Sequence, residues 1–456
     1  MTERAEVIVL GMGPGSEDVA ERLAEAGLDV IGIDAELVGG ECPYWGCVPS
    51  KMMIRAADLL AEGRRVPGMA GTSTIVPDWS PVAARIRQEA TDDWDDAVAV
   101  RRFEDKGGRF VRGWGRLDGT RRVAVGEEVY EASRGVVVGI GSRAWAPPVD
   151  GLADTPYWTN RDAIETREVP ARLAVLGGGA IGVELAQVFR RFGSEVTVLE
   201  AGPRLGGPEE PESASLLAEV FEAEGIDTRT GVRIGSVHHD GERFSITLGQ
   251  GDPVVVDRLL VAAGRRPDLA RLNASSVGLD ESARALPVDD HLRVVGAEGL
   301  WAVGDVTGKG AFTHVSMYQA DIVVRDILGQ GVVPADYRAV PHVTFTDPEI
   351  GSVGMTEHEA REAGLAVRVG MAQIPSSTRG WIHKAGNEGF IKLVEDADRG
   401  VLVGATSVGP WGGEVLGLLA LAVHAEVPTR TLRHMIYAYP TFHRAIEAAV
   451  KELLPD

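Results

Sequence analysis

The only two cysteines of the 456-residue chain, Cys42 and Cys47, lie five positions apart in the stretch GGECPYWGCVPSK (39–51). On a regular α-helix, residues at this spacing have Cα atoms about 8–9 Å apart, whereas a disulfide spans about 7 Å at most. The pair can therefore close only on a distorted backbone, which Pro43 and Gly46 permit. Such a disulfide is predicted to be reducible rather than structural. The following VPSK is typical of a helix start, whose dipole favours a Cys47 thiolate.

Spaced cysteines also serve as zinc ligands, and some pairs are inert and buried. A structural zinc site needs four ligands, usually thiolates and imidazoles. This chain has no third cysteine, and its first histidine is His238. We therefore predict no metal site. From the residues alone, an inert buried pair stays open as an alternative.

Two segments of the chain repeat one order of strand, glycine-rich turn, helix and strand. The first begins with VIVLGMGPGS (7–16) and ends its second strand at Asp34; the other begins with LAVLGGGAIG (173–182) and ends at Glu200. Glycine lets the backbone approach a pyrophosphate, the helix N-terminus stabilises its charge, and the carboxylate binds ribose hydroxyls. The repeat predicts two dinucleotide sites. Two ordinary strand-turn-helix units without a ligand are the alternative.

Details of the two copies refine this prediction. Ser16 stands where the third glycine of the first copy is expected, and serine is small enough for close helix packing. In the second copy Glu200 would repel the 2′-phosphate of NADP(H), which favours NAD(H). Arg204 lies nearby in sequence and could offset this repulsion, so NADP(H) stays possible.

Length and charge limit the other classes of protein. A chain of 456 residues predicts two to four domains. The net charge of −21 argues against nucleic acid or an anionic membrane as a partner. No secretory signal is expected, and the apolar run VLGLLALAV (415–423) is too short for a membrane span. A cytoplasmic protein is expected, where paired cysteines are more often catalytic than structural. The last 115 or so residues lack a phosphate-type glycine loop and predict a third, α+β domain.

In these motifs and their order, the whole chain resembles the class I flavin-dependent pyridine nucleotide–disulfide oxidoreductases, such as dihydrolipoamide dehydrogenase, glutathione reductase and mercuric reductase. The matching pieces are VLGMGPGS, GGECPYWGCVPSK, GIGSRAWAP, LGGGAIGVELA, AAGRRPD, LWAVGDV, TDPEIGSVGMTEHEA and YPTFHRAIE. The resemblance implies an α/β fold with two Rossmann-like three-layer domains and a C-terminal α+β dimerisation domain. It places the FAD-binding domain at 1–150 and 268–337, the NAD(P)-binding domain at 151–267 and the dimerisation domain, which would build a homodimer, at 338–456.

The resemblance also implies the cofactor-binding residues. Those for FAD would be Gly11, Gly13, Gly15, Ser16, Asp34, Gly40, Gly141, Gly304 and Asp305. Those for the nicotinamide cofactor would be Gly177, Gly179, Gly182, Glu200 and Gly264. Asp34 would bind the FAD ribose, and Asp305 would hold the ribityl chain.

The family pattern assigns roles in electron transfer. Hydride would pass from NAD(P)H to the flavin and then to the disulfide, with Cys47 as the flavin-facing thiolate and Cys42 as the outer thiol that exchanges with a substrate. Lys51 would lie near flavin N5 and pair with Glu184. A nearby carboxylate keeps a buried lysine charged, so that it can stabilise the reduced flavin.

One family feature is missing. Thiol-exchanging members carry a His-Pro-Thr-x-x-Glu motif, whose histidine is the acid/base at the outer cysteine. Here Tyr439 and Arg444 occupy the histidine and glutamate positions. His443 lies four residues past Tyr439, on the helix that PTFHRAIEAAV is expected to form, and is a candidate replacement base. Tyr439 could donate a proton but is a poor base at neutral pH. Dihydrolipoamide oxidation should therefore be slow.

These observations give one leading hypothesis and two alternatives. The leading one is a dimeric FAD enzyme that passes electrons from NAD(P)H through Cys42 and Cys47 to a small-molecule acceptor, either a disulfide or an acceptor that needs no histidine base. In the second, the protein is an NAD(P)H:quinone or metal-ion reductase whose flavin reduces the acceptor directly. The disulfide then has only a secondary role. Mercury reduction has little support, because the chain ends in KELLPD without the extra C-terminal cysteine pair of mercuric reductase. The third is a non-catalytic redox sensor.

Overall fold

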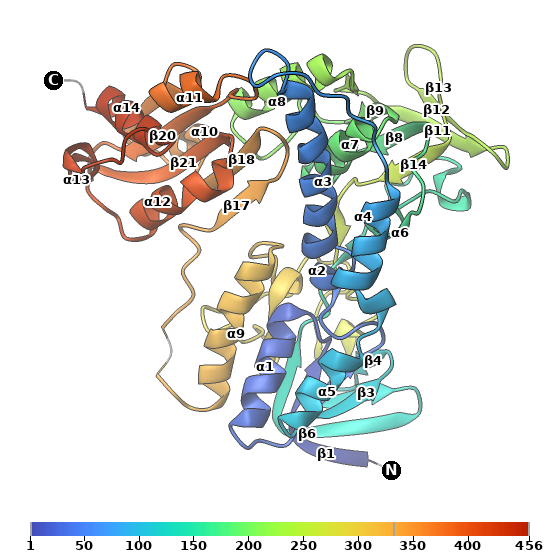
Figure 1. Ribbon diagram of the computed structural model, residues 1–456. Helices are drawn as coiled ribbons and strands as arrows, with labels where there is room; N and C mark the ends of the chain where they lie inside the picture. The colour runs from blue at the N-terminus through green and yellow to red at the C-terminus, as the bar shows by residue number, and fades with distance from the viewer. Residues whose placement is uncertain (1, 332, 455–456) are drawn as a thin grey trace. The chain divides into compact units, whose positions relative to one another are not determined.

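The computed structural model describes residues 2–331 and 333–454 (Figure 1). The chain folds into two compact units, each built from three stretches of sequence. Unit one comprises Met1–Ser50, Ala84–Trp145 and Arg265–Tyr337, and unit two comprises Lys51–Ala83, Ala146–Gly264 and Arg338–Asp456.

Unit one is built on a seven-stranded sheet in the order β3-β2-β1-β6-β5-β4, with β16 also paired to β6. Its strands are β1 (Thr2–Leu10), β2 (Val30–Asp34), β3 (Arg109–Arg112), β4 (Gly115–Leu117), β5 (Arg122–Val125), β6 (Glu128–Val138) and β16 (Leu300–Ala302). Strands β3, β2, β1, β6 and β16 run parallel, whereas β5 pairs antiparallel with β6, and β4 pairs antiparallel with β5. The last four residues of β1, VIVL (7–10), are buried on both faces, as in parallel sheets covered on both sides.

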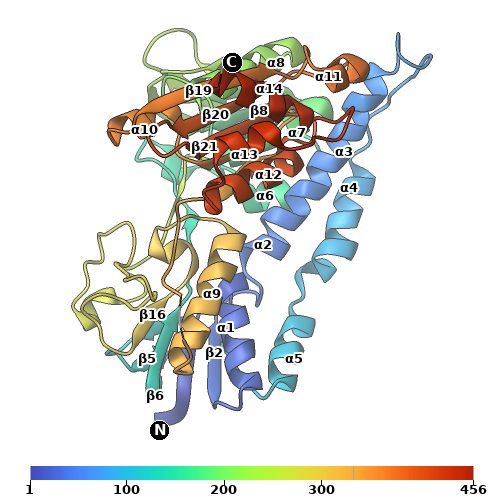
Figure 2. The same ribbon diagram turned by 90° about the vertical axis from the view of Figure 1, so that its left-hand side faces the viewer.

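Helices cover one face of this sheet. They are α1 (Pro14–Glu25), α5 (Ala97–Asp105) and α9 (Thr313–Ile327), which Figure 2 shows side by side. Their apolar faces share one core with the sheet, to which Val19, Phe103 and Val323 contribute. The segment 265–302 packs a second core against the other face through residues such as Leu272 and Leu286. The short pair β7 (Arg143–Ala144) and β15 (Arg265–Arg266) completes this unit.

Unit two contains a second parallel sheet, in the order β10-β9-β8-β14. Its strands are β8 (Arg172–Leu176), β9 (Glu195–Leu199), β10 (Asp227–Arg229) and β14 (Arg258–Val261), accompanied by the helices α6 (Asn160–Glu165), α7 (Ala180–Arg191) and α8 (Pro211–Glu224). An antiparallel meander of β11 (Ile234–His239), β12 (Phe244–Leu248) and β13 (Val254–Val256) packs on its core.

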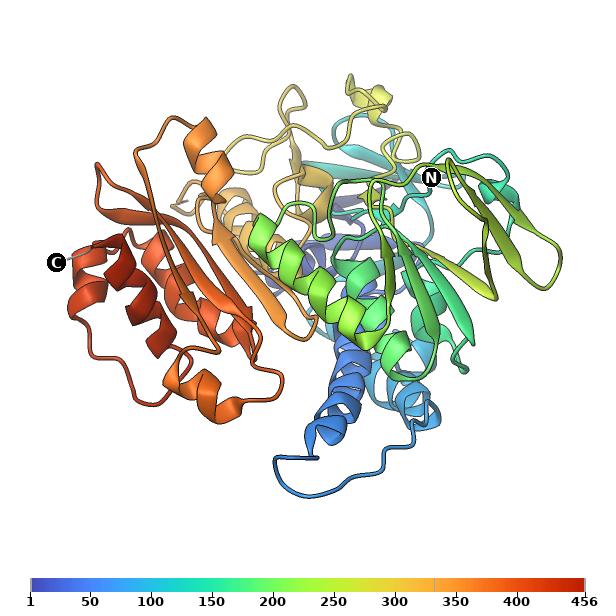
Figure 3. The same ribbon diagram turned by 90° about the horizontal axis from the view of Figure 1, so that it is seen from above.

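The C-terminal part of unit two is a five-stranded antiparallel sheet in the order β17-β18-β21-β20-β19. Its strands are β17 (Pro341–Thr344), β18 (Glu349–Gly354), β19 (Val367–Gln373), β20 (Phe390–Asp396) and β21 (Val401–Gly409), and its helices are α10 (Glu357–Glu362), α11 (Thr378–His383), α12 (Gly412–His424), α13 (Thr429–His434) and α14 (Arg444–Leu453). Helices α12 and α14 pack against the sheet through one apolar core (Figure 3). No phosphate-type glycine loop opens any of these helices.

Helix α3 (Cys47–Arg65) begins in unit one and continues into unit two. It is preceded by the single turn α2 (Glu41–Tyr44), and α4 (Ser80–Arg85) follows a long connection. Within residues 2–331 and 333–454, no helix combines the length and the apolar character that a bilayer span requires.

Candidate active site

The first glycine loop follows the carboxyl end of β1 as the sequence predicts. Gly11 has a φ of +89°, and a Cβ there would lie 2.4 Å from the carbonyl oxygen of Gly139, so only glycine fits. Gly13 caps α1, and a Cβ on it would meet no described protein atom within 4 Å. The open space beside Gly13 is where a ligand can approach the backbone at the start of a helix.

Ser16 in this loop is accommodated by two neighbours. Its hydroxyl donates a hydrogen bond of 3.1 Å to the Gly13 carbonyl oxygen. A Cβ on Gly139 would lie 2.5 Å from the Ser16 side chain, so the extra atoms of the serine are matched by a glycine on the facing strand end. The prediction that helix packing survives this serine is confirmed.

The second glycine loop, after β8, repeats the geometry. Gly177 has a φ of +111°, and a Cβ on it would lie 2.4 Å from the Ala262 carbonyl oxygen. Gly179 caps α7, and a Cβ there would meet no described atom within 4 Å. Gly182 lies against the loop backbone, since its Cβ would be 2.0 Å from the Gly177 oxygen. The two loops are thus built alike, with a closed first turn and an open helix start.

A carboxylate closes each loop at the end of the second strand. Asp34 accepts a 2.7 Å hydrogen bond from the Met12 amide, and burial raises the pKa of Asp34 above its ordinary value. Glu200 accepts hydrogen bonds from the amides of Gly178 (2.6 Å) and Gly202 (2.5 Å). Each ionised carboxyl has about four acceptor positions, so both retain capacity for ribose hydroxyls.

A polar chain that the sequence did not predict links Asp305 to Arg265. The Ser142 hydroxyl donates to Asp305 Oδ2 over 2.5 Å. Arg265 donates to the Ser142 hydroxyl and to its carbonyl oxygen, at 3.0 and 2.6 Å. Gly141 and Gly304 beside this chain have φ values of +61° and +77°. The chain fixes the orientation of the Asp305 carboxylate at the edge of the sheet.

The cysteine segment is distorted in the way its spacing requires. Helix α2 ends at Tyr44, and Trp45 has a non-helical φ of −137° before α3 starts at Cys47. Gly40, with a φ of +66°, packs so closely on the first loop that its Cβ would lie 2.9 Å from the Gly13 Cα. The predicted helix start is confirmed, and it lies at Cys47 itself.

The two cysteine sulfurs are unbonded thiols that share a hydrogen bond. This hydrogen bond and burial raise the pKa of the Cys42 thiol. Cys47 Sγ also lies 3.5 Å from the Thr313 hydroxyl, at the first residue of α9. In the reduced pair, Cys42 therefore holds its proton more tightly than a free thiol does, and Cys47 lies at a helix N-terminus, where the helix dipole favours negative charge.

Lys51 and Glu184 form the ion pair that the family resemblance implied. Lys51 Nζ lies 2.7 Å from Glu184 Oε2 and 4.5 Å from the centre of the Phe345 ring. The Glu184 side chain is 7% exposed, and its other oxygen accepts a 2.8 Å hydrogen bond from the Phe345 amide. Both carboxylate oxygens are thus engaged, which fixes the position of the lysine.

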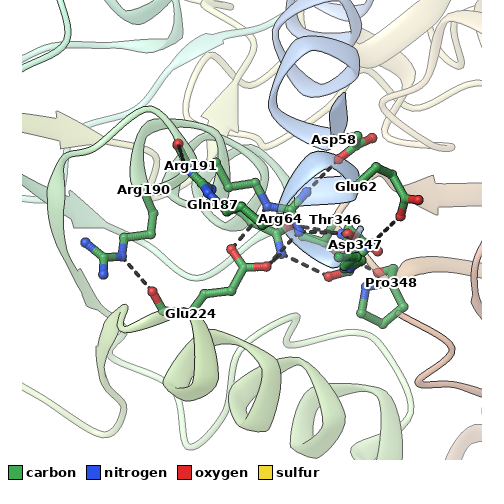
Figure 4. Close-up of polar contacts among 11 residues, drawn as sticks. Asp58, Glu62, Arg64, Gln187, Arg190, Arg191, Glu224, Thr346, Asp347 and Pro348 are labelled. Atoms are coloured by element: carbon green, nitrogen blue, oxygen red, sulfur yellow. Dashed lines mark hydrogen bonds and ion pairs between the residues drawn. The ribbon is translucent and has the colours of Figure 1, made fainter. Parts of the chain in front are cut away.

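A buried arginine anchors the other end of α3 (Figure 4). Arg191, on α7, is 2% exposed and contacts the carboxylates of Asp58 (2.7 Å), Glu224 (2.6 Å) and Asp347 (2.7 Å). Arg65, in the last turn of α3, also contacts Asp347, at 2.7 Å. Three elements of unit two, α3, α8 and the loop before β18, are joined to α7 by this cluster.

The C-terminal candidates do not form an acid/base dyad within this chain. The Tyr439 side chain is 65% exposed, and the Arg444 guanidinium stacks on its ring at 5.4 Å. Helix α14 was expected to begin near Pro440, with His443 inside it; this is wrong, because α14 begins at Arg444 and His443 is its exposed N-cap. The preceding residues instead form a turn that the Thr441 hydroxyl closes on the Ala438 carbonyl.

Two further candidates concern charge and metal ions. Arg204 donates to the carbonyl oxygens of Gly207 (3.1 Å) and Glu209 (3.3 Å), so its guanidinium is bound to its own loop. Gly264, after β14, has a φ of +127°.

Among the described residues, the side chains close enough to share a metal ion are Asp289, Asp290 and His291, and the cysteines are not among them.

Comparisons with known proteins agree with this geometry. A family described as pyridine nucleotide-disulphide oxidoreductase matches residues 5–320, and its dimerisation domain matches residues 340–450. A dihydrolipoyl dehydrogenase from Thermus scotoductus is 32% identical, over 98% of this chain and 97% of its own length. The chain belongs to this oxidoreductase family. A mercuric reductase from Acidithiobacillus ferrooxidans is 31% identical, over 100% of this chain and 83% of its own.

A solved structure is similar over the whole fold. The Cu(II) complex of RclA, an HOCl-induced flavoprotein disulfide reductase from Escherichia coli, has a TM-score of 0.86 at 25% identity, covering 98% of this chain and 99% of RclA. The protein is thus a FAD-dependent pyridine nucleotide–disulfide oxidoreductase with two Rossmann-like domains and a C-terminal α+β dimerisation domain. Its two glycine loops fit FAD and a nicotinamide cofactor, because both leave open space at a helix start.

Four functional candidates were not predicted from the sequence. Ser142, Arg265, Thr313 and Phe345 meet their partners only through the tertiary fold. The motifs GIGSR and AAGRR were used to predict Gly141 and Gly264 as site residues. Ser142 and Arg265, which follow these glycines, could have been predicted from the same motifs.

Proposed function

We propose that this oxidoreductase passes electrons from NADH through FAD to Cys42 and Cys47, and from Cys42 to a small-molecule acceptor. The observation that carries the proposal is the hydrogen-bonded thiol pair, in which Cys47 is the first residue of α3 and the pKa of the Cys42 thiol is raised by the hydrogen bond to Cys47 and by burial. A cycling pair of this kind suits the reducing conditions of the cytoplasm.

FAD, when bound, would accept a hydride from the nicotinamide and release two electrons. The residues proposed to hold it are Gly11, Gly13, Gly15, Ser16, Asp34, Gly40, Gly141, Gly304 and Asp305, with Ser142 and Arg265 orienting Asp305. The N-terminus of α1 would stabilise the pyrophosphate, and Asp34 would accept hydroxyl hydrogen bonds.

Lys51 would supply a fixed positive charge for the electron-rich flavin. Its ammonium is held by Glu184 and lies over Phe345, so it cannot swing into solvent without losing both contacts. Glu184 is therefore proposed as the residue that positions Lys51.

NADH is the proposed donor. The residues proposed to bind it are Gly177, Gly179, Gly182, Glu200 and Gly264. Glu200 would repel a 2′-phosphate, and Arg204 is already bound to carbonyl oxygens of its own loop. The domain boundaries 1–150 with 268–337, 151–267 and 338–456 are proposed on the same family pattern, together with a homodimer built by the last domain.

The acceptor is proposed to be one that needs no histidine base, because Tyr439 is exposed and stacked with Arg444. A second candidate function follows from the same feature. If electrons leave the flavin directly, a quinone or a metal ion could be the acceptor, and RclA forms a complex with Cu(II). In that case Cys42 and Cys47 would not be needed for turnover.

An anaerobic titration of the FAD-loaded protein with dithionite separates the two functions. An active cysteine pair takes up four electrons per FAD and produces a long-wavelength thiolate–flavin absorbance at the halfway point. Uptake of two electrons would contradict the proposal. A Cys42→Ser variant that reduces quinones normally but no longer reduces disulfides would show that the protein has two electron exits.

A further inference from the structure

A cleft with a volume of about 480 Å³ opens beside Cys42 in unit one. Of the two cysteines, Cys42 lines it and Cys47 does not. Tyr44, Thr313 and the loop that follows the π-helical turn Ile86–Ala90 also line it. The cleft is therefore the space from which a small molecule can reach the outer sulfur.

The charged side chains of this cleft are mostly acidic. Glu17, Asp92 and Asp95 contribute three carboxylates, against one cation from Arg102. Arg102 is shared between the carboxylates of Glu17 and Glu21, so its charge is already balanced. Asp92 and Asp95 are exposed, and no ion pair to either is found among the described residues. They leave the cleft net negative.

The loop that carries these two aspartates is fixed in an unusual conformation. Asp92, Asp93 and Trp94 have φ values of +47°, +57° and +60°, a left-handed run that side chains rarely adopt. The buried Thr91 hydroxyl donates to the Ile86 carbonyl and accepts from the Trp94 amide. Arg87 lies over the Trp94 ring at 5.2 Å and pairs with Asp93. The surroundings thus hold the loop in place, with Asp92 and Asp95 on the cleft.

The pKa of Tyr44, which lines the cleft, is affected by carboxylates around it. Burial and the carboxylates of Asp96, Glu17 and Asp95 raise the pKa of Tyr44 to about 12. The hydrogen bond to Cys47 and burial raise the pKa of the Cys42 thiol. An anionic substrate would be repelled here, whereas a cation would be attracted and would favour the Cys42 thiolate.

We propose that this cleft selects small disulfides that carry positive charge, with Asp92 and Asp95 as the specificity-determining residues. The inference rests on the proposed function, because it needs electrons to leave through Cys42. It also addresses the missing dyad: an ammonium group of the substrate, held by the two aspartates, lowers the cost of deprotonating Cys42 and replaces part of what a histidine would supply.

The reaction balances without further reactants. Cys42, having released its proton to solvent, attacks one sulfur of the substrate; the substrate S–S bond breaks, and the leaving thiolate takes up a proton. Cys47 then attacks Cys42 Sγ, re-forms the intramolecular disulfide and releases the second thiol. Two electrons pass from the cysteine pair to the substrate, and NADH replaces them.

Three disulfides of matched length test the proposal on the FAD-loaded enzyme: cystamine, 2-hydroxyethyl disulfide and 3,3′-dithiodipropionate, which carry positive, no and negative charge. We expect kcat/KM to be highest for cystamine and lowest for the dianion. Asp92→Asn and Asp95→Asn should each lower the cystamine-to-dianion ratio by about three- to tenfold at low salt. Asparagine tolerates the left-handed conformation, so the loop should be retained. Asp105→Asn is the matched control, because Asp105 is an exposed aspartate at the end of α5, outside this loop, and does not line the cleft.

A second readout is independent of nicotinamide and flavin. In a Cys47→Ser variant the mixed disulfide on Cys42 cannot be released, so mass spectrometry can follow its formation with each compound. We expect the same order of rates among the three compounds. Adding Asp92→Asn to this variant should make the differences between these rates smaller. Equal ratios in the Asp92 and Asp95 variants and the Asp105→Asn control would overturn the inference, as would turnover of none of the three disulfides. Four-electron uptake in the anaerobic titration would still leave the proposed function standing.

Discussion

Replacing Arg191 with methionine is expected to destabilise unit two strongly. The guanidinium is 2% exposed and contacts three carboxylates, of Asp58, Glu224 and Asp347, at 2.6–2.7 Å. Methionine fills much of the volume but leaves these carboxylates facing one another without their cation. Breaking a buried charge network in this way costs about 3–5 kcal/mol.

The neighbouring Arg190 provides a matched control. Its guanidinium donates to two carbonyl oxygens, of Glu224 (2.6 Å) and Ser194 (3.2 Å), and the side chain is partly exposed. Water can replace those partners, so Arg190→Met should cost about 1–2 kcal/mol. At roughly 2–4 °C per kcal/mol for a unit of this size, Arg191→Met should lower Tm by about 6–20 °C and Arg190→Met by a few degrees.

The effect of Arg191→Met should depend on pH through Asp58. Burial raises the pKa of Asp58 to about 6, above its ordinary value, while Arg191 acts to lower it. A carboxyl with a raised pKa holds its proton more tightly in the folded state, so its contribution to stability falls as pH rises through that pKa. Without Arg191 the pKa rises further and the loss extends to higher pH. The Tm deficit of the variant should therefore be smaller at pH 5 than at pH 8.

Thermal melts of the FAD-loaded proteins, followed by circular dichroism at one scan rate, measure these differences even if unfolding is irreversible. A Tm for Arg191→Met within about 2 °C of that for Arg190→Met would refute the reasoning, given the size expected from the network. So would a deficit that shrinks from pH 5 to pH 8, because the uncompensated carboxylates would then not be its cause.

Three further predictions concern catalysis. Glu184→Gln keeps the shape of the Lys51 partner but removes its charge. It should slow flavin reduction by NADH about tenfold in stopped-flow measurements. An unchanged rate would show that the position of Lys51 does not depend on that carboxylate. Tyr439→His combined with Arg444→Glu should raise dihydrolipoamide-dependent NAD⁺ reduction by about 100-fold, since it supplies a general base, and no gain would mean that the base is not what limits this reaction. Glu200→Gln should raise kcat/KM for NADPH relative to NADH by about tenfold by removing a repulsive charge; the opposite shift would argue for a cation elsewhere in the loop.

Local patterns in the sequence were sufficient to predict the elements at both nucleotide loops. Alternation of apolar strand, glycine turn and amphipathic helix depends on neighbours within about thirty residues. The glycines after β1 and β8, the closing carboxylates Asp34 and Glu200 and the helix start at Cys47 all lie where the sequence places them. The Lys51–Glu184 pair was predicted by family resemblance rather than by spacing, because its members are 133 residues apart.

What the sequence could not provide are contacts whose partners meet only after folding. Arg191 has three carboxylate partners from three different elements, and no periodicity marks it among the other arginines. The left-handed run at Asp92–Trp94 is imposed by the buried Thr91 and by Arg87, against the ordinary preference of those residues. The start of α14 was misplaced because a side-chain hydrogen bond in the preceding turn competes with helix formation.

By itself, the sequence of this protein determined that two phosphate-binding loops and one reducible cysteine pair are present, because each depends on residue types at short spacing. Tertiary structure alone decided which charges surround that pair. The carboxylates of Asp92 and Asp95 reach the cleft of Cys42 from a loop 50 or more residues further along the chain. Electrostatic potential is a sum over neighbours in space, so the charge around Cys42 is set by the fold rather than by any motif.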